Sequence, residues 1–494
     1  MYTHSMVMIK EFMSSVSANA PGNKFYPSDK YKEFCTPESS TDSICKDLAS
    51  FPLNDGTTLD AKGKFWIEAY GCSSSMNDSE MISGMLKNDG YQMSESPHDA
   101  SVNIIVTCSV KDTTEHRMLH RIAKLSESGK PLIVAGCLPK ADRVKVESIN
   151  SSASMIGPET IERITEVVRS SVSGRKKVEL ENDKSSHKLN IPKIRLNPIV
   201  SIVQIASGCL SECSFCQTRL VKGSLRSYRP GDIVRQIKAD LFQGCKEIWL
   251  SSTDNGCYGR DIGTNLASLL SKCCELDGDF KIRVGMMNPM YIPRLLNPLV
   301  DIFSQENKIL KFLHMPVQSG SDRVLRKMRR GHSVQTFLKA VQIFRDRIPE
   351  ITIATDIIVG YPSETEEDFK QTVDLLEMTK PDIVNISMYS ARHGVLASCE
   401  KKVPSHITKN RSRRLDKIVS DISSLRNSQW VGWTGEIIVD EIAENFVQGR
   451  NYAYKPIILT SDHKIKLRDT LSLGSRVRVT VFGSSRYALR ANLL

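Results

Sequence analysis

The stretch VSIVQIASGCLSECSFC, residues 200–216, decides the fold class of the central part of this 494-residue chain. Its first seven residues are rich in β-branched side chains and predict a strand. Three cysteines follow within eight residues, Cys209, Cys213 and Cys216. Three thiolates on one short loop can hold three irons of a four-iron cluster and leave the fourth iron open to a substrate. A zinc site, which needs a fourth ligand and a different spacing, and a group of structural thiols are the alternatives.

Downstream of this loop, short apolar strands alternate with helical stretches. The expected strands are residues 200–206, 247–251, 281–286, 311–315, 352–359 and 383–388, with helices such as 230–243, 333–347 and 365–378 between them. Alternation of this kind favours an α/β fold with parallel strands. Six such units are two short of the closed eight-stranded barrel, so we expect an open, partial (βα)6 barrel.

A second set of cysteines lies upstream, each within two residues of the end of an expected strand. The strands are residues 65–70, 103–107 and 132–136, and the cysteines are Cys72, Cys108 and Cys137. The carboxyl ends of neighbouring parallel strands meet at one edge of a sheet, where ligands bind in such folds. The sequence therefore predicts that one sheet edge gathers these thiols; three buried core cysteines are the alternative.

The rest of the chain divides by composition. We expect a mobile extension over residues 1–60, an N-terminal parallel α/β domain over 61–172, a polar linker over 173–195 and the barrel over 196–428. Residues 429–494 show short strands with turns and predict a small all-β barrel. No apolar run reaches the length of a membrane span, and residues 1–14 do not form a signal peptide, so we expect a cytoplasmic protein without a membrane partner.

Basic residues point to a nucleic-acid partner without establishing one. The net charge is +11, and residues 429–494 contain nine Lys or Arg against six Asp or Glu. A basic helix over residues 408–428 carries Lys409, Arg411, Arg413, Arg414 and Lys417. These charges could pair with phosphates, and Tyr452 or Tyr454 could stack on a base. An ordinary solvated surface with core tyrosines is the alternative.

From about Lys64 to the end, the chain resembles the methylthiotransferases of the radical S-adenosylmethionine superfamily. Within them it is most similar to the archaeal and eukaryal type that acts on tRNA N6-threonylcarbamoyladenosine. The matching segments include the three-cysteine loop and residues 70–72, 107–111, 135–138, 285–289, 314–321 and 355–362. Residues 429–494 resemble the TRAM domain, a small RNA-binding barrel.

The resemblance implies two 4Fe–4S clusters and S-adenosylmethionine as cofactors. Cys209, Cys213 and Cys216 would hold the cluster that cleaves S-adenosylmethionine. Cys72, Cys108 and Cys137 would hold an auxiliary cluster that carries the sulfur to be inserted. The product would be the 2-methylthio derivative of the modified adenosine at position 37. The implied partners are tRNA, a low-potential electron donor of flavodoxin or ferredoxin type, and a sulfur donor.

Polar groups and glycines at expected strand ends are candidates for binding S-adenosylmethionine, because barrel enzymes keep their sites at the carboxyl ends of strands. They are Ser251, Asp254, Gln318, Ser319, Gly320, Asp356, Gly360 and Glu364. Turn capping by the same residue types is the alternative. Cys257, close to Asp254, is a further cysteine that could approach this site.

Two other functions fit the same motifs. One is a methylthiotransferase that acts on isopentenyladenosine in tRNA or on a ribosomal protein. The other is a noncatalytic RNA-binding iron–sulfur protein, which would bind RNA without cleaving S-adenosylmethionine.

Overall fold

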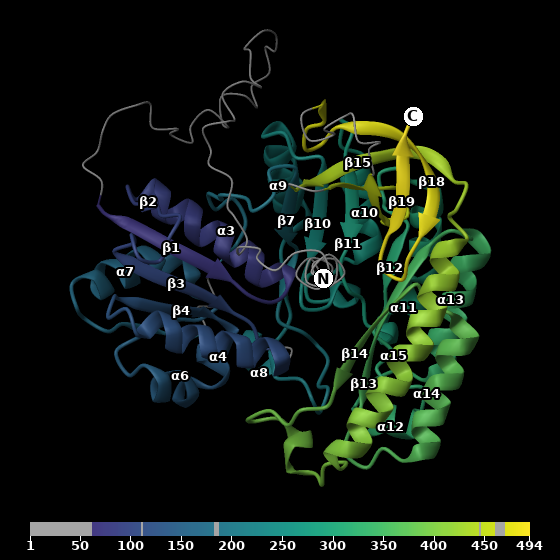
Figure 1. Ribbon diagram of the computed structural model, residues 1–494, viewed down its shortest axis with the longest axis horizontal. Coiled ribbons are helices and arrows are strands. Elements are labelled where there is room, and N and C mark those ends of the chain that lie inside the picture. The colour runs from purple at the N-terminus through teal and green to yellow at the C-terminus, as the bar shows by residue number, and fades with distance from the viewer. Residues whose placement is uncertain (1–61, 110–111, 182–186, 444–445, 460–469) are drawn as a thin grey trace.

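The computed structural model describes residues 62–109, 112–181, 187–443, 446–459 and 470–494. The extension expected over residues 1–60, with Cys35 and Cys45, lies outside these ranges. Within them, no helix is both long and apolar enough to cross a membrane. Figure 1 shows an α/β unit beside an open barrel, with a small β-barrel at the C-terminal end.

The N-terminal unit is a six-stranded sheet in which every paired strand is parallel, as expected. The strand order is β2-β1-β3-β4-β5-β6. The strands are β1 (Lys64–Ala69), β2 (Gln92–Met93), β3 (Val102–Thr107), β4 (Leu132–Gly136), β5 (Ser154–Ile156) and β6 (Val178–Glu179). The helices are α3 (Ser73–Asn88), α4 (Asp112–Ser126), α5 (Cys137–Ala141), α6 (Arg143–Ile149) and α7 (Ile164–Val172). Strands β3 and β4 are buried throughout, since helices cover both faces of such a sheet.

The central unit confirms the six expected strands. They form two three-stranded parallel sheets, β7-β10-β11 and β12-β13-β14, and a parallel bridge between Ile282 and Ile309 connects the two. The strands are β7 (Val200–Gln204), β10 (Glu247–Ser251), β11 (Lys281–Val284), β12 (Phe312–His314), β13 (Thr352–Val359) and β14 (Ile383–Met388). The main helices are α9 (Pro230–Phe242), α10 (Leu266–Cys274), α11 (Ile292–Gln305), α13 (Val334–Arg347), α14 (Glu366–Thr379) and α15 (Ser405–Ser428).

Short elements surround the carboxyl ends of these strands and shape the site. They are β8 (Ala206–Ser207), α8 (Thr218–Lys222), β9 (Arg226–Ser227), η3 (Asn255–Cys257), η4 (Pro289–Tyr291), α12 (Asp322–Lys327) and η5 (Leu396–Cys399). Because β8 pairs with β9, the three-cysteine loop is the connection between two antiparallel segments.

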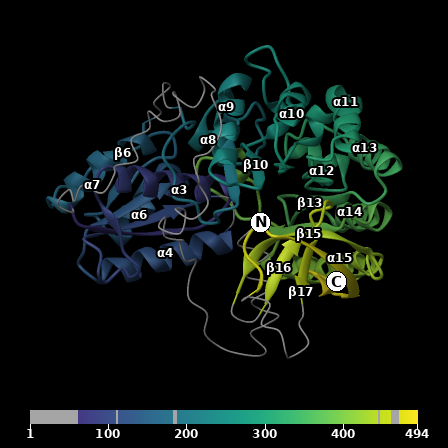
Figure 2. The same cartoon turned by 90° about the horizontal axis from the view of Figure 1, so that it is seen from above.

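The C-terminal unit is a closed five-stranded barrel in the order β15-β16-β17-β19-β18, as the strand pattern predicted. Its strands are β15 (Thr434–Ile442), β16 (Val447–Arg450), β17 (Pro456–Leu459), β18 (Arg476–Ser484) and β19 (Leu489–Leu493). In the view from above, this barrel lies against α15 and the central barrel (Figure 2). The side chain of Asn427 in α15 donates to the carbonyl of Ser485 at 2.9 Å.

Tyr454 closes the amino end of the central barrel, which corrects the expectation that it is free to stack on a base. Its ring lies 5.1 Å from the Phe312 ring, and the Arg283 guanidinium lies 5.2 Å from its centroid. Next to it, Lys455 forms a buried ion pair with Asp382 at 2.8 Å. Tyr452 is also engaged: its hydroxyl bonds to Glu350, and its ring packs on two tryptophans of the small barrel.

The segment 173–195 is partly structured rather than a simple linker. It supplies β6, which pairs with β5 at the edge of the N-terminal sheet. Its later part is packed as well, because Lys188 is buried and forms an ion pair with Asp78 in α3 at 2.7 Å. Residues 182–186 lie outside the described part of the chain.

Candidate functional site

Cys72, Cys108 and Cys137 lie together at one edge of the N-terminal sheet, as expected from their positions. They follow β1, β3 and β4, which are neighbours in the sheet, and Cys137 begins α5. Gly71, with φ of +111°, permits the close approach: a Cβ at this position would lie 2.2 Å from the Cβ of Cys108. The glycine therefore brings the loops after β1 and β3 into contact.

The thiols of Cys72 and Cys137 differ in their electrostatic environment. A hydrogen bond from Cys108, assisted by the Lys222 ammonium, holds the pKa of Cys72 well below its usual range. Burial raises the pKa of Cys137 to about 11, although the Lys222 ammonium opposes the shift. A cysteine with a low pKa beside a cation is present as the thiolate, which is the form that binds metals.

The contacts between the N-terminal sheet and the open barrel form a polar interface that we call the domain seam. Its central members are Ser73, Ser74, Asp78, Lys188 and Lys222. The Ser73 hydroxyl lies 2.8 Å from that of Ser251 at the end of β10. Lys222, at the end of α8, donates to Ser74 at 2.6 Å. The cysteines of the N-terminal sheet therefore face the mouth of the barrel.

A tight turn before Cys209 fixes the three-cysteine loop. Gly208 has φ of +70°, and a Cβ there would lie 1.9 Å from the carbonyl oxygen of Ser224. The backbone N–H of Ser211 donates to the sulfur of Cys209 at 3.3 Å. Arg330 directs its guanidinium at the sulfur of Cys213, at 3.4 Å. Donors of this kind stabilise thiolates, which are the form that binds iron.

Two further groups lie beside this loop, Asp254 and Cys257. One ligand atom from each of Cys209, Asp254 and Cys257 lies within 4.8 Å of the others, and all three residues are buried. A hydrogen bond from Cys257 lowers the pKa of Cys209 to about 6, and burial followed by the Cys209 charge raises the pKa of Asp254 to about 7. The structure thus places Cys257 at the site that its position in the sequence only suggested.

Four of the eight candidate cofactor residues lie at the mouth of the barrel: Ser251, Asp254, Gln318 and Asp356. Gln318 has φ of +76°, and its buried Oε1 atom has no hydrogen-bond partner in the described part of the chain. Such an orphaned acceptor is costly unless a ligand donates to it. Asp356 accepts from Asn385 at 2.6 Å and lies 3.1 Å from His314.

The other four candidates, Ser319, Gly320, Gly360 and Glu364, face the outer helices. A Cβ on Gly320 would lie 2.4 Å from the carbonyl oxygen of Gln371 in α14, and one on Gly360 would lie 2.3 Å from Thr408 in α15. The Ser319 hydroxyl lies 3.5 Å from that of Thr372. These contacts pack the strand ends against α14 and α15.

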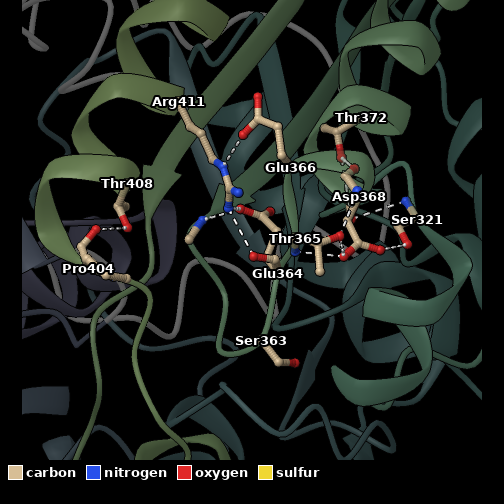
Figure 3. A network of polar contacts seen from close by, with 12 residues as sticks. Ser321, Ser363, Glu364, Thr365, Glu366, Asp368, Thr372, Pro404, Thr408 and Arg411 are labelled. Atoms are coloured by element: carbon tan, nitrogen blue, oxygen red, sulfur yellow. Dashed lines mark hydrogen bonds and ion pairs between the residues drawn. The ribbon is translucent and has the colours of Figure 1, made fainter.

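Glu364 belongs to the same outer network, in which Arg411 is its partner (Figure 3). The two side chains are nearly fully buried and lie 2.7 Å apart, and Arg411 also bonds to Glu366 at 3.2 Å. The proposal that Arg411 contacts RNA is therefore wrong. Arg414 is paired with Glu366 as well, whereas Lys409, Arg413 and Lys417 are exposed at a four-residue spacing.

Sequence reasoning missed Lys222 and Arg330 as parts of the site. Neither belongs to a metal-ligating residue type, and each reaches its partners only through the tertiary fold. The one local signal for Lys222 is its place six residues after Cys216.

Known proteins resemble the chain over both cysteine sets. The model of the Radical SAM superfamily matches residues 203–376, and that of the Uncharacterized protein family UPF0004 matches residues 64–157. Among solved structures, the radical S-adenosylmethionine methyltransferase TsrM from Kitasatospora setae shares the fold, with a TM-score of 0.51 and 10% identity over 68% of this chain and 77% of that one.

Curated relatives extend the similarity to most of the chain. A probable threonylcarbamoyladenosine tRNA methylthiotransferase of Pyrococcus horikoshii is 40% identical over 410 residues, which is 82% of this chain and 96% of the relative. The human threonylcarbamoyladenosine tRNA methylthiotransferase is 33% identical over 461 residues, or 91% of this chain and 77% of the relative. The chain belongs to the threonylcarbamoyladenosine tRNA methylthiotransferase family of radical S-adenosylmethionine enzymes.

Proposed function

We propose that the protein converts N6-threonylcarbamoyladenosine at position 37 of tRNA into its 2-methylthio derivative. The observation that carries this proposal is the placement of the two cysteine sets. Ser73, next to Cys72, contacts Ser251 at the mouth of the barrel that holds the three-cysteine loop. Sulfur insertion needs a sulfur-carrying site close to the place where the adenine is activated, and the domain seam supplies that proximity.

The donor sets fit two iron–sulfur clusters. Cys209, Cys213 and Cys216 would hold one, and Cys72, Cys108 and Cys137 the other; three thiolates leave one iron of a four-iron cluster open. The orphaned acceptor of Gln318 and the carboxylate of Asp254 provide polar groups for S-adenosylmethionine at the mouth of the barrel. When bound, these cofactors supply reductive cleavage of S-adenosylmethionine and the transfer of a methylated sulfur.

The side chains around the site hold the three-cysteine loop in position and are not themselves reactants. The N–H of Ser211 and the guanidinium of Arg330 stabilise thiolates of the three-cysteine loop. The Ser214 hydroxyl in the same loop lies 2.8 Å from the Tyr361 hydroxyl and donates to the carbonyl of Lys327 at 2.9 Å. These bonds fix the loop against α12, so that the cofactor and the adenine meet in a fixed geometry.

The reaction also defines the partners that the enzyme needs. We infer a low-potential electron donor of flavodoxin or ferredoxin type, because reductive cleavage consumes an electron, and a sulfur donor, because each product gains a sulfur atom. The tRNA substrate supports a cytoplasmic location. The rival substrates, isopentenyladenosine in tRNA and a ribosomal protein, are not favoured, since the similar curated proteins are named for threonylcarbamoyladenosine.

Mass spectrometry of tRNA nucleosides from a deletion strain tests the proposal. We expect 2-methylthio-N6-threonylcarbamoyladenosine to disappear and its precursor, N6-threonylcarbamoyladenosine, to accumulate. The wild-type chain should restore the product, and the Cys209→Ala variant should not. Loss of a methylthio-isopentenyladenosine instead would assign the other substrate, and an unchanged nucleoside profile would contradict the proposed function.

A further inference from the structure

Lys222 connects the two cysteine sets of the molecule. It is the last residue of α8, the short helix that begins two residues after Cys216. Its side chain is buried and crosses the domain seam, where the ammonium donates to the Ser74 hydroxyl at 2.6 Å. Ser74 is two residues after Cys72. A lysine supplied by the three-cysteine loop therefore ends within the cysteine site of the other domain.

The two buried carboxylates nearest to Lys222 in the domain seam, Asp78 and Glu159, are already paired with other cations. Asp78 bonds to Lys188 at 2.7 Å. Glu159 bonds to Arg226 at 2.9 Å and accepts from Ser207 at 2.7 Å. In the ranges that the structure describes, Lys222 has no carboxylate within ion-pair distance, and its one hydrogen-bond partner is the neutral Ser74.

The groups that balance the charge of Lys222 include the cysteines. Burial by itself lowers the pKa of a lysine, but Cys137, Cys72, Asp78 and Glu159 hold the pKa of Lys222 above its usual range. Asp78 and Glu159 each have a closer cation, and the contact that Lys222 makes is with Ser74, two residues after Cys72. A buried lysine without such a partner would be strongly disfavoured.

We propose that Lys222 is a positioning residue that sets the reduction potential of the cluster held by Cys72, Cys108 and Cys137. This inference rests on the proposed function, because it requires a cluster at those cysteines. Three thiolates make the site anionic, and reduction adds a further negative charge. A fixed cation in a water-poor interior favours the reduced form, as charges and hydrogen bonds near cluster sulfurs do in general. Lys222 therefore makes the auxiliary site easier to reduce.

The test is a redox titration of the full chain reconstituted with both clusters and followed by electron paramagnetic resonance. The auxiliary signal is the one that a Cys72→Ala/Cys108→Ala/Cys137→Ala variant lacks. In the Lys222→Met variant, we expect the equilibrium constant for reduction of this cluster to fall by about tenfold, a shift of about 59 mV to lower potential for a one-electron couple. The potential of the other cluster should stay within error.

Two further variants separate charge from structure. Lys222→Arg keeps the charge and should retain the wild-type potential. Ser74→Ala removes the hydrogen bond but not the charge, so it should shift the potential less than Lys222→Met does. If Lys222→Met does not fold, Lys222→Gln takes its place, since the amide can keep the bond to Ser74.

The outcomes are distinct. An auxiliary potential that is unchanged in a Lys222→Met or Lys222→Gln variant with full iron content overturns the role of Lys222. An equal shift in Lys222→Arg overturns it as well, because poorer packing would then explain the effect. A wild-type chain that binds only one cluster contradicts the proposed function itself, before any variant is measured.

Discussion

At the scale of single residues, the two cysteine sets have separable tasks. Cys209, Cys213 and Cys216 lie on one loop of the barrel, whereas Cys72, Cys108 and Cys137 follow three different strands of another sheet. Each set has its own environment: Asp254 and Cys257 lie beside the first, and Lys222 and Ser75 beside the second. Separate environments allow one set to be removed without dismantling the other.

We therefore expect a Cys72→Ala/Cys108→Ala/Cys137→Ala variant to keep radical chemistry and lose sulfur insertion. Its iron content should fall from about eight to about four per chain, because only one of two four-iron clusters remains. With a chemical reductant it should still release 5′-deoxyadenosine but form no methylthio product; chromatography of the reaction mixture measures both. Complete loss of cleavage in a folded variant would show that the two sets depend on each other.

Also at this scale, neighbouring arginines of α15 differ sharply. Successive helical residues are about 100° apart, so Arg411 and Arg413 point in nearly opposite directions. Arg411 is buried against Glu364, and Arg413 is exposed. Two positions that belong to one basic run in the sequence therefore serve stability and surface charge respectively.

Arg411→Ala should destabilise the barrel by about 3–5 kcal/mol, because it leaves the buried Glu364 carboxylate without its partner. Arg413→Ala, the matched control on the same helix, should change stability by less than about 0.5 kcal/mol. Differential scanning calorimetry of both variants decides the point. Equal melting temperatures would mean that the Glu364–Arg411 pair contributes no net stability.

At the scale of elements, α15 offers one exposed basic stripe, made of Lys409, Arg413 and Lys417. The four-residue spacing aligns the three side chains on one helical face. In the described part of the chain, none of the three has a carboxylate partner within ion-pair distance. This stripe, rather than the whole basic run, is the part of α15 whose cations remain exposed to solvent and available to phosphates.

Changing the stripe to alanine should weaken tRNA binding and flatten its salt dependence. Removing one phosphate-binding cation lowers the slope of log K against log salt by roughly 0.7–0.9. Fluorescence anisotropy titrations at several salt concentrations measure the slope. A control with Lys238, Lys272 and Lys339 changed to alanine removes three exposed lysines from other helices. The same slope in both variants would exclude the stripe as a phosphate-binding surface.

At the scale of the whole molecule, the C-terminal barrel is a structural part of the central one. Tyr454 packs on Phe312 and Trp249 at the amino end of the strands, with Arg283 against its ring. Lys455 pairs with the buried Asp382. Deleting residues 429–494 would expose these aromatic rings and leave Asp382 short of a partner, so the truncation cannot isolate an effect on RNA.

Tyr454→Ala should accordingly destabilise the chain by about 3–5 kcal/mol, the range for removing a buried aromatic ring. Tyr487→Ala, at a partly exposed tyrosine of the same small barrel, serves as the control and should have a smaller effect. Thermal melting of the two variants gives the comparison. If Tyr454→Ala melts like the wild type, the small barrel does not stabilise the central barrel through this contact.

The sequence by itself determined the features that short segments of the chain encode, namely the strands and the spacing of the cysteines. Apolar periodicity located the six barrel strands; 247–251, 352–359 and 383–388 match β10, β13 and β14 residue for residue. The spacing of the thiols identified the three-cysteine loop. The occurrence of a cysteine after each of three expected strands placed Cys72, Cys108 and Cys137 at one edge of the N-terminal sheet. These predictions succeed because both the period of a strand and the spacing of ligands on a loop are local properties.

Only the tertiary structure decided which polar residues are buried, and against what. Ser251, Asp254, Gln318 and Asp356 lie at the mouth of the barrel. Gly320, Gly360 and Glu364 follow expected strands in the same way in the sequence, but they pack on outer helices. The same holds for Lys222, whose contact with Ser74 joins residues 148 positions apart. Burial and charge pairing depend on which helices and strands pack against each other, and no local pattern of the chain encodes that packing.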